Sequence, residues 1–260
     1  MKRALLPVLA LLLPLTACGG DDESTADDRG DSGGTTTLTV YAAASLTATF
    51  EQIAADFEAE HDGVEVELSF GGSSDLVTQI TEGAEADVFA SAATKNMDDL
   101  VAADLTGAEP QDFATNVLEI AVPPGNPAGV ESLQDLTGDL NLVLCAPEVP
   151  CGAAAQQVAE AAGISFSPVS EEQAVTDVLA KVASGEADAG LVYVTDVAAA
   201  GDDVEGIEFP ESADVVNTYP IAPVADSDEA DLAQEFVDFV LGATGQSVLQ
   251  DAGFGQPQPR

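Results

Sequence analysis

Apolar and polar positions near the start of the chain follow the order expected of a strand that leads into a helix. The run LTVYAAA, residues 38–44, is apolar and contains β-branched residues, which predicts a buried strand. Residues 45–61 then repeat large apolar side chains at helical spacing, as in a helix that buries one face. The members of this apolar stripe are Leu46, Phe50, Ile53, Ala54 and Phe57.

The same exchange of strand and helix recurs along the rest of the sequence. Strands are predicted at 64–70, 86–92, 116–127, 140–146 and 219–225. Helices are predicted at 71–83, 94–103, 151–163, 170–187, 228–242 and 243–254, and a strand that runs into a helix at 189–201. Alternation at this spacing is typical of βαβ units, so the pattern predicts an α/β fold with parallel sheets.

Three places in this pattern share one design, a strand that ends in small residues where a helix begins. They are residues 41–45, 70–74 and 149–152. In open α/β sheets, ligands sit beyond the carboxyl ends of the strands, where helix N-termini present unpaired N–H groups. Glycine and alanine let a ligand approach the backbone, and serine adds a hydroxyl donor. Together the turns predict an anion or small-ligand site, although each serine alone is also what a plain helix cap looks like.

The first residues form a separate unit. Lys2 and Arg3 precede an apolar run of about twelve residues, too short to span a bilayer and typical of an export signal. The run ends in LTAC, which resembles the lipobox of bacterial lipoproteins and predicts a signal peptide over 1–17 with lipidation at Cys18. The alternative is an ordinary signal peptide with an incidental cysteine. Residues 18–36 are rich in Gly, Ser, Thr and Asp, as in a flexible acidic tether.

The charge of the chain limits the kinds of partner that it can bind. Six basic residues stand against 47 acidic ones, a net charge of −41, while 46% of residues are apolar. Such a chain has enough apolar residues for a core, and its acidic surface repels nucleic acid and anionic lipid. From residue 37 on, the basic residues are Lys95, Lys181 and Arg260, and none lies in the three turns. We therefore expect any anion there to be held by neutral hydrogen-bond donors.

Two further cysteines, Cys145 and Cys151, flank a short loop with two prolines. In an exported protein a close pair most often forms a disulfide, although two free thiols remain an alternative. A metal site would need more ligands nearby, and His61 is the single histidine of the sequence. We expect no metal coordinated directly by side chains and no cofactor.

Catalysis is not indicated. The sequence has no GxSxG motif, no histidine near a serine and no cluster of metal ligands, and its acidic residues are scattered as on solvated helix faces. The protein is therefore not expected to be an enzyme.

Five segments then point to a family. In order, they are AAASLT, SFGGSSDL, ADVFASA, APEVPCG and SGEADAGLVYVTD. This series, within about residues 37–255, resembles the periplasmic molybdate-binding proteins of ABC transporters, a group within the type II solute-binding fold. The resemblance implies two α/β lobes, each a mostly parallel sheet flanked by helices, joined by two hinge crossings. It places lobe 1 at 37–119 plus 217–260 and lobe 2 at 120–216.

The resemblance also assigns ligand contacts residue by residue. Ser45 and Ser73 would donate hydroxyl and backbone N–H groups, Cys151 and Val175 backbone N–H groups, and Tyr193 its phenol. Cys151 stands where the family usually has alanine. Because Gly71 and Gly72 replace small or serine residues of relatives, Ser74 remains an alternative to Ser73. For Val175 and Tyr193 the alternative is a purely structural place in the core.

The function implied by the resemblance is capture of molybdate, and of tungstate, by an exported lipoprotein anchored on the outer face of the cell membrane. A monomer would then deliver the anion to the membrane permease of an ABC transporter. Two alternatives stay open. One is a binding protein of the same fold for another oxyanion such as sulfate, and the other is a structural surface lipoprotein without a transport role.

Overall fold

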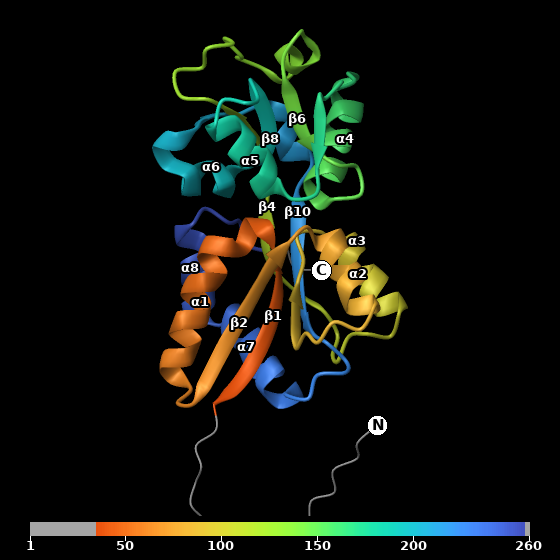
Figure 1. Ribbon diagram of the computed structural model, residues 1–260, viewed down its shortest axis with the longest axis vertical. Coiled ribbons are helices and arrows are strands. Elements are labelled where there is room, and N and C mark those ends of the chain that lie inside the picture. The colour runs from red at the N-terminus through yellow and green to blue at the C-terminus, as the bar shows by residue number, and fades with distance from the viewer. Residues whose placement is uncertain (1–34, 258–260) are drawn as a thin grey trace, which may run out of the picture. The chain divides into compact units, whose positions relative to one another are not determined.

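The computed structural model describes residues 35–257. The predicted signal peptide, the lipidation site Cys18 and nearly all of the tether lie outside the described residues. Among the described residues, no helix has both the length and the apolar character needed to cross a membrane. The described part of the chain forms two sheets with their helices, shown in Figure 1.

The first sheet has five strands in the order β2-β1-β3-β10-β4. β1 pairs in parallel with β2 and β3, whereas β10 runs antiparallel to both β3 and β4. The strands are β1 (Thr36–Ala43), β2 (Val64–Gly71), β3 (Val88–Ala90), β4 (Gln111–Asn116) and β10 (Asn217–Pro223). The helices beside this sheet are η1, a 3-10 helix (Ala44–Leu46), α1 (Thr47–Glu60), α2 (Ser73–Thr81), α3 (Thr94–Ala102), α7 (Ala230–Leu241) and α8 (Ala243–Asp251).

The second sheet repeats this plan in the order β7-β6-β8-β5-β9. β6 is parallel to β7 and β8, and β5 is antiparallel to β8 and β9. The strands are β5 (Leu118–Val122), β6 (Leu142–Cys145), β7 (Ser170–Glu172), β8 (Ala189–Tyr193) and β9 (Glu205–Ile207). The helices are η2 (Leu133–Thr137), α4 (Pro150–Ala162), α5 (Val175–Ala183), α6 (Val194–Ala200), η3 (Gly201–Asp203) and η4 (Pro210–Asp214).

The chain crosses between the sheets twice within the described residues. It leaves the first sheet at Val117, between β4 and β5, and returns between β9 and β10. The first crossing therefore lies two residues before the boundary expected at residue 119. We refer to the first sheet with its helices as the first lobe and to the second sheet with its helices as the second lobe.

Apolar side chains cover both faces of the first sheet. On one face α1, α7 and α8 pack an aromatic cluster in which the rings of Phe57 and Phe236 are 5.2 Å apart and those of Phe50 and Phe113 5.8 Å apart. On the other face, α2 and α3 cover the sheet (Figure 1), and Leu76 of α2 packs there with other apolar residues. A sheet buried on both faces needs near-continuous apolar strands, which is why the run at 38–44 predicted its strand correctly.

Two expectations from the pattern need correction. The predicted helix over 170–187 is a short strand, β7, followed by the shorter helix α5, because Ser170 and Glu172 pair with β6. The sheets are mixed rather than parallel throughout, because the strands beside the crossings, β10 and β5, enter their sheets in the opposite direction. β4 was not predicted as a strand of its own, since its sequence QDFATN carries little apolar character.

Candidate anion-binding site

One small cavity is lined by all five residues that the sequence assigned to a ligand. Ser45 and Ser73 come from the first lobe, and Cys151, Val175 and Tyr193 come from the second. The other lining residues are Ala43, Ala44, Gly71, Gly72, Ala92, Val149 and Pro150. The cavity measures about 10 Å³, close to the least space that holds one water molecule. It leaves no room for a bulky organic ligand, and an ion larger than a water molecule needs the walls of the cavity to part slightly from their positions in this structure.

The starts of four helices, η1, α2, α4 and α5, meet at this cavity. The residues in their N-cap positions are Ala43, Gly72, Val149 and Ala174, and none of these described residues caps its helix through a side chain. Alanine, valine and glycine carry no side-chain acceptor, so the first N–H groups of these helices are left for another partner. Four uncapped N-termini around one cavity give it the partial positive charge that favours an anion.

The two serines are not the caps of their helices. Ser45 lies inside η1, and its Oγ is 3.0 Å from the hydroxyl of Tyr219. Ser73 is the first residue of α2, and its Oγ accepts a hydrogen bond of 3.1 Å from the N–H of Ala92. Because that bond uses a lone pair, the Ser73 proton is free to be donated into the cavity. The interpretation of these serines as plain helix caps is wrong.

Two neighbours of Ser73 lie outside the cavity lining. Ser74 Oγ is buried and has no hydrogen-bond partner among the described residues. Asp75 is exposed on α2, so its charge points to solvent rather than to the cavity. The geometry thus favours Ser73 over Ser74 as the serine of this turn.

Tyr193 ends β8 and is 1% exposed. Its hydroxyl accepts a hydrogen bond of 3.0 Å from Nδ2 of Asn217. Burial raises the pKa of Tyr193 well above its ordinary value, and the nearby Tyr219 and Asp196 raise it further. Burial likewise raises the pKa of Tyr219. Both phenols stay protonated at physiological pH, so each remains a neutral hydrogen-bond donor.

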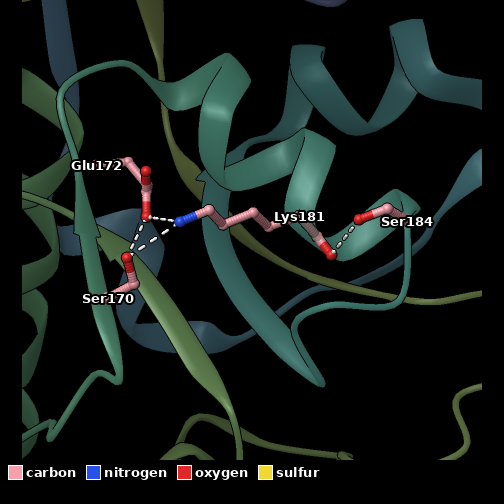
Figure 2. A network of polar contacts seen from close by, with 4 residues as sticks. All are labelled: Ser170, Glu172, Lys181 and Ser184. Atoms are coloured by element: carbon pink, nitrogen blue, oxygen red, sulfur yellow. Dashed lines mark hydrogen bonds and ion pairs between the residues drawn. The ribbon is translucent and has the colours of Figure 1, made fainter.

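The lysines of the described residues are engaged away from the cavity. Lys181 on α5 forms an ion pair with Glu172 on β7 and donates a hydrogen bond of 3.1 Å to Ser170, as Figure 2 shows. The hydrogen bond from Lys181 is the main cause that lowers the pKa of Glu172. Lys95 pairs with Asp99 at 2.8 Å on the exposed side of α3. Neither lysine lines the cavity, so the hydrogen-bond donors of the cavity are neutral.

The turns of the second lobe are held by covalent and ionic contacts. A disulfide joins Cys145 at the end of β6 to Cys151 in the first turn of α4. The ion pair of Lys181 and Glu172 ties α5 to β7 on either side of the turn that leads to Val175. These contacts fix the two turns that present the N–H groups of Cys151 and Val175.

The lobes touch at the edge of the cavity. A Cβ atom added at Gly72, in the first lobe, would lie 2.1 Å from the backbone oxygen of Gln173 in the second. Real Cβ atoms do not come this close to oxygen, so only glycine allows the two backbones to approach at this point. The structure is therefore closed around the candidate site.

Four residues next to the cavity had no signal in the sequence analysis: Asn116, Asp196, Asn217 and Tyr219. Asp196 is buried and accepts a hydrogen bond of 2.8 Å from the backbone N–H of Tyr193. Burial raises the pKa of Asp196 to about 7, while that hydrogen bond acts in the opposite direction. Its position three residues after Tyr193, at the start of a helix, resembles a capping position, which is the one local signal that could have marked it.

Two larger cavities elsewhere in the described residues contain carboxylates, which disfavour an anion. One of about 380 Å³ is lined by several acids, among them Asp87, Asp226 and Glu229. Another of about 460 Å³ contains Glu119 and Glu208, and burial, followed by the charge of Glu208, raises the pKa of Glu119. No group of histidine, cysteine, aspartate or glutamate in the described residues could hold a metal ion. The small cavity is thus the place where neutral donors converge.

The sequence matches the family described as "Bacterial extracellular solute-binding protein" over residues 38–255. It is 46% identical over 248 residues to the molybdate-binding protein ModA of Mycobacterium tuberculosis (strain ATCC 25618 / H37Rv), with 95% of each chain covered. It is 34% identical over 230 residues to the molybdate-binding protein ModA of Escherichia coli (strain K12), with 84% of this chain and 88% of that one covered.

Among solved structures, the periplasmic molybdate-binding protein of Azotobacter vinelandii is similar to this chain with a TM-score of 0.75 and 25% sequence identity. The match covers 85% of this chain and all of that one. The similarity in fold thus extends over both lobes.

Proposed function

This chain belongs to the bacterial extracellular solute-binding proteins, and we propose that it binds molybdate, and also tungstate, in the cavity between its lobes. The observation that carries the proposal is the convergence of uncapped helix N-termini and neutral hydroxyls on one small cavity. The named relatives are binding proteins rather than enzymes, and two of them are molybdate-binding proteins with 46% and 34% identity.

The chemistry of the lining favours a small oxyanion without protons. In the proposed complex, Ser45 and Ser73 donate through hydroxyl and backbone N–H groups, Cys151 and Val175 through backbone N–H groups, and Tyr193 through its phenol. A donor-only site satisfies the lone pairs of a fully deprotonated oxyanion, whereas a protonated phosphate would need an acceptor for its O–H group. Molybdate and tungstate are nearly the same size, so both should fit, and the smaller sulfate should fit loosely.

Neutral donors are sufficient for tight binding. A hydrogen bond to a charged group contributes roughly 1.5–3 kcal/mol, so about seven of them give roughly 10–20 kcal/mol before association costs. A nanomolar dissociation constant corresponds to about 12 kcal/mol. An anion can therefore be held without a lysine or arginine, although association costs take part of the gross energy.

The fold suggests how binding is passed on. We propose that the first and second lobes close on the anion, and that a membrane permease of an ABC transporter recognises the closed form. Membership in this extracellular family indicates export. Anchoring through a lipidated Cys18, which lies outside the described residues, belongs to the proposal, and so does a monomeric state.

The test is thermal unfolding of the purified protein with and without molybdate, tungstate, sulfate or phosphate. A ligand at about 1,000 times its dissociation constant should add about 4 kcal/mol to the free energy of unfolding and raise the midpoint by several degrees. Stabilisation by molybdate and tungstate supports the proposal. Stabilisation by sulfate or phosphate alone would keep the fold and overturn the substrate. No stabilisation by any of these anions would favour a structural lipoprotein instead.

A further inference from the structure

A buried polar layer lies behind the hydroxyls that face the cavity. Asn116 ends β4 and Asn217 begins β10, and the two stand directly opposite each other in the antiparallel pair beside the lobe crossings. Asn116 is 4% and Asn217 9% exposed. Two buried phenols, Tyr193 and Tyr219, separate these asparagines from the site. All four polar groups are removed from water, so each must find its partners within the protein.

The orientation of the Asn217 amide follows from its neighbours. Its Nδ2 atom lies 3.0 Å from the backbone oxygen of Ala92 and 3.0 Å from the hydroxyl oxygen of Tyr193. A carbonyl oxygen can only accept, so the atom that faces it must be the amide nitrogen, which then donates to Tyr193 as well. Because the Tyr193 oxygen accepts this bond, its own proton points elsewhere, and Tyr193 lines the cavity.

The same reasoning applies to Asn116. Its Oδ1 accepts a hydrogen bond of 3.0 Å from the N–H of Val117, which assigns Nδ2 to the other side. Nδ2 donates to Thr195 Oγ1 at 2.8 Å, so the orientation of the Asn116 amide is also fixed. The Tyr219 hydroxyl lies 3.0 Å from Ser45 Oγ, and either oxygen can donate in this pair.

We propose that Asn217 fixes the direction of the Tyr193 proton, so that this hydroxyl acts toward the ligand as a donor alone. Asn217 acts through Tyr193, so it is a positioning residue. The inference rests on the proposed function, since it concerns the selectivity of the same cavity.

The physical reason lies in the double nature of a hydroxyl group. A free hydroxyl donates one proton and accepts through its lone pairs, so it can also receive the proton of hydrogen phosphate. When an asparagine already occupies the accepting side, an anion that carries a proton finds no acceptor there. Asn217 contacts Ala92 in the first lobe and Tyr193 in the second, so this arrangement is complete only when the lobes are closed.

The first test is Asn217→Ala, with dissociation constants measured by calorimetry for molybdate and for inorganic phosphate. One hydrogen bond to a charged group is at stake, so we expect molybdate to bind about 10- to 100-fold more weakly. Phosphate binding should be unchanged or stronger, so the preference for molybdate over phosphate falls. The matched control is Asn141→Ala, which removes an asparagine bound to Asp188 on the exposed side of the second lobe and should change neither constant.

A double-mutant cycle separates positioning from a general structural role. In a Tyr193→Phe background, Asn217→Ala should change the molybdate constant by less than about threefold, because the group through which it acts is gone. Asn217→Ser, which removes the same amide with a smaller loss of volume, repeats the cycle and decides the matter if Asn217→Ala does not fold. Equal losses for all anions, repeated in full in the Phe background, would overturn the inference.

The wild-type protein in the same experiment separates this inference from the proposed function. If it binds neither molybdate nor tungstate, the proposed function fails. If it binds molybdate and Asn217→Ala keeps both the affinity and the preference, only the positioning role is wrong.

Discussion

The two lobes have the same arrangement of strands but present different groups to the cavity. Each sheet has four strands that run in one direction and one, β10 or β5, that runs in the opposite direction, and each lobe directs helix starts to the cavity. In the proposed complex, the first lobe contributes the serine hydroxyls of Ser45 and Ser73, which line the cavity. The turns of the second lobe carry Cys151 and Val175, whose side chains offer no comparable donor, so only their backbone N–H groups can serve.

This difference explains how each lobe holds its donors. A hydroxyl can rotate to its target, and Ser73 is oriented by one hydrogen bond from Ala92. A backbone N–H points where the chain points, so the whole turn must be held in place. In the second lobe a disulfide and the ion pair of Lys181 with Glu172 do this. Recognition through backbone N–H groups therefore requires that the whole loop be held in place, rather than a single side chain.

The largest effects on molybdate binding and on stability are expected from substitutions at two glycines, one in each lobe. A Cβ at Gly72 would meet Gln173 of the opposite lobe, whereas a Cβ at Gly152 would lie 2.0 Å from Ala146 of its own lobe. Gly72→Ala should therefore block closure, weaken molybdate binding by more than about 100-fold, and leave the ligand-free protein as stable as the wild type. Gly152→Ala should instead lower the free energy of unfolding.

Calorimetry and thermal unfolding of both glycine variants check this contrast. Gly71→Ala is the matched control, because its Cβ would meet only the Leu76 side chain at an ordinary distance of 3.4 Å. If Gly72→Ala binds molybdate like the wild type, the lobes do not need the close approach seen in this structure.

The second-largest effect concerns Asp196, the buried carboxyl group of the second lobe. Burial raises the pKa of Asp196 from an ordinary 3.8 to about 7, so between these values the folded protein keeps a proton that the unfolded chain has lost. The free energy of unfolding should therefore fall as the pH rises from about 4 to about 7 and stay low above that. Asp196→Asn should remove this slope and stabilise the protein near pH 8 by up to about 4 kcal/mol.

Chemical denaturation of wild type and Asp196→Asn across this pH range measures the effect. Asp75→Asn, at an exposed aspartate of the first lobe, controls for the loss of one negative charge. Parallel curves for wild type and Asp196→Asn would show that the buried carboxyl is not the cause of any pH dependence.

The third effect concerns the hydroxyls of the first lobe. Ser45→Ala and Ser73→Ala should each weaken molybdate binding about 10- to 100-fold, since each removes one hydrogen bond to a charged ligand. Ser73→Ala should also cost about 1–3 kcal/mol of stability, because the buried N–H of Ala92 loses its acceptor. Titration calorimetry checks affinity, with Ser74→Ala as the neighbouring control. A loss in Ser74→Ala equal to that in Ser73→Ala would contradict the assignment of the donor.

The smallest effect on binding should come from the loop of the second lobe. Replacing both Cys145 and Cys151 with alanine opens a short covalent loop and should lower the free energy of unfolding by about 2 kcal/mol. Alanine keeps the backbone N–H at position 151, so affinity should weaken less than in the serine variants. Denaturation and calorimetry of the double variant test this, and reductant should affect the wild type alone. A binding loss larger than that of Ser73→Ala would mean that the loop depends on the disulfide more than the packing suggests.

The sequence pattern predicted much of the fold and of the candidate site. The apolar runs marked most strands, and small residues at strand ends marked the turns of Ser45, Ser73 and Cys151, which the structure brings to one cavity. It missed β4, β7 and β9 because short, polar strands carry no apolar alternation. It could not decide whether Ser45 was a cap, since that depends on where its hydroxyl points.

Local features of this chain, such as apolar periodicity, small residues at turns and a scarcity of basic side chains, depend on neighbouring residues and are therefore readable in the sequence. The tertiary structure alone decided that Asn217 meets both Ala92 and Tyr193, that Tyr219 meets Ser45, and that Gly72 meets Gln173. These contacts join residues from 24 to 174 positions apart where hydrogen bonds link them, and no local pattern records such a pairing. The chain specifies the donors by sequence, and the packing of two lobes specifies their direction.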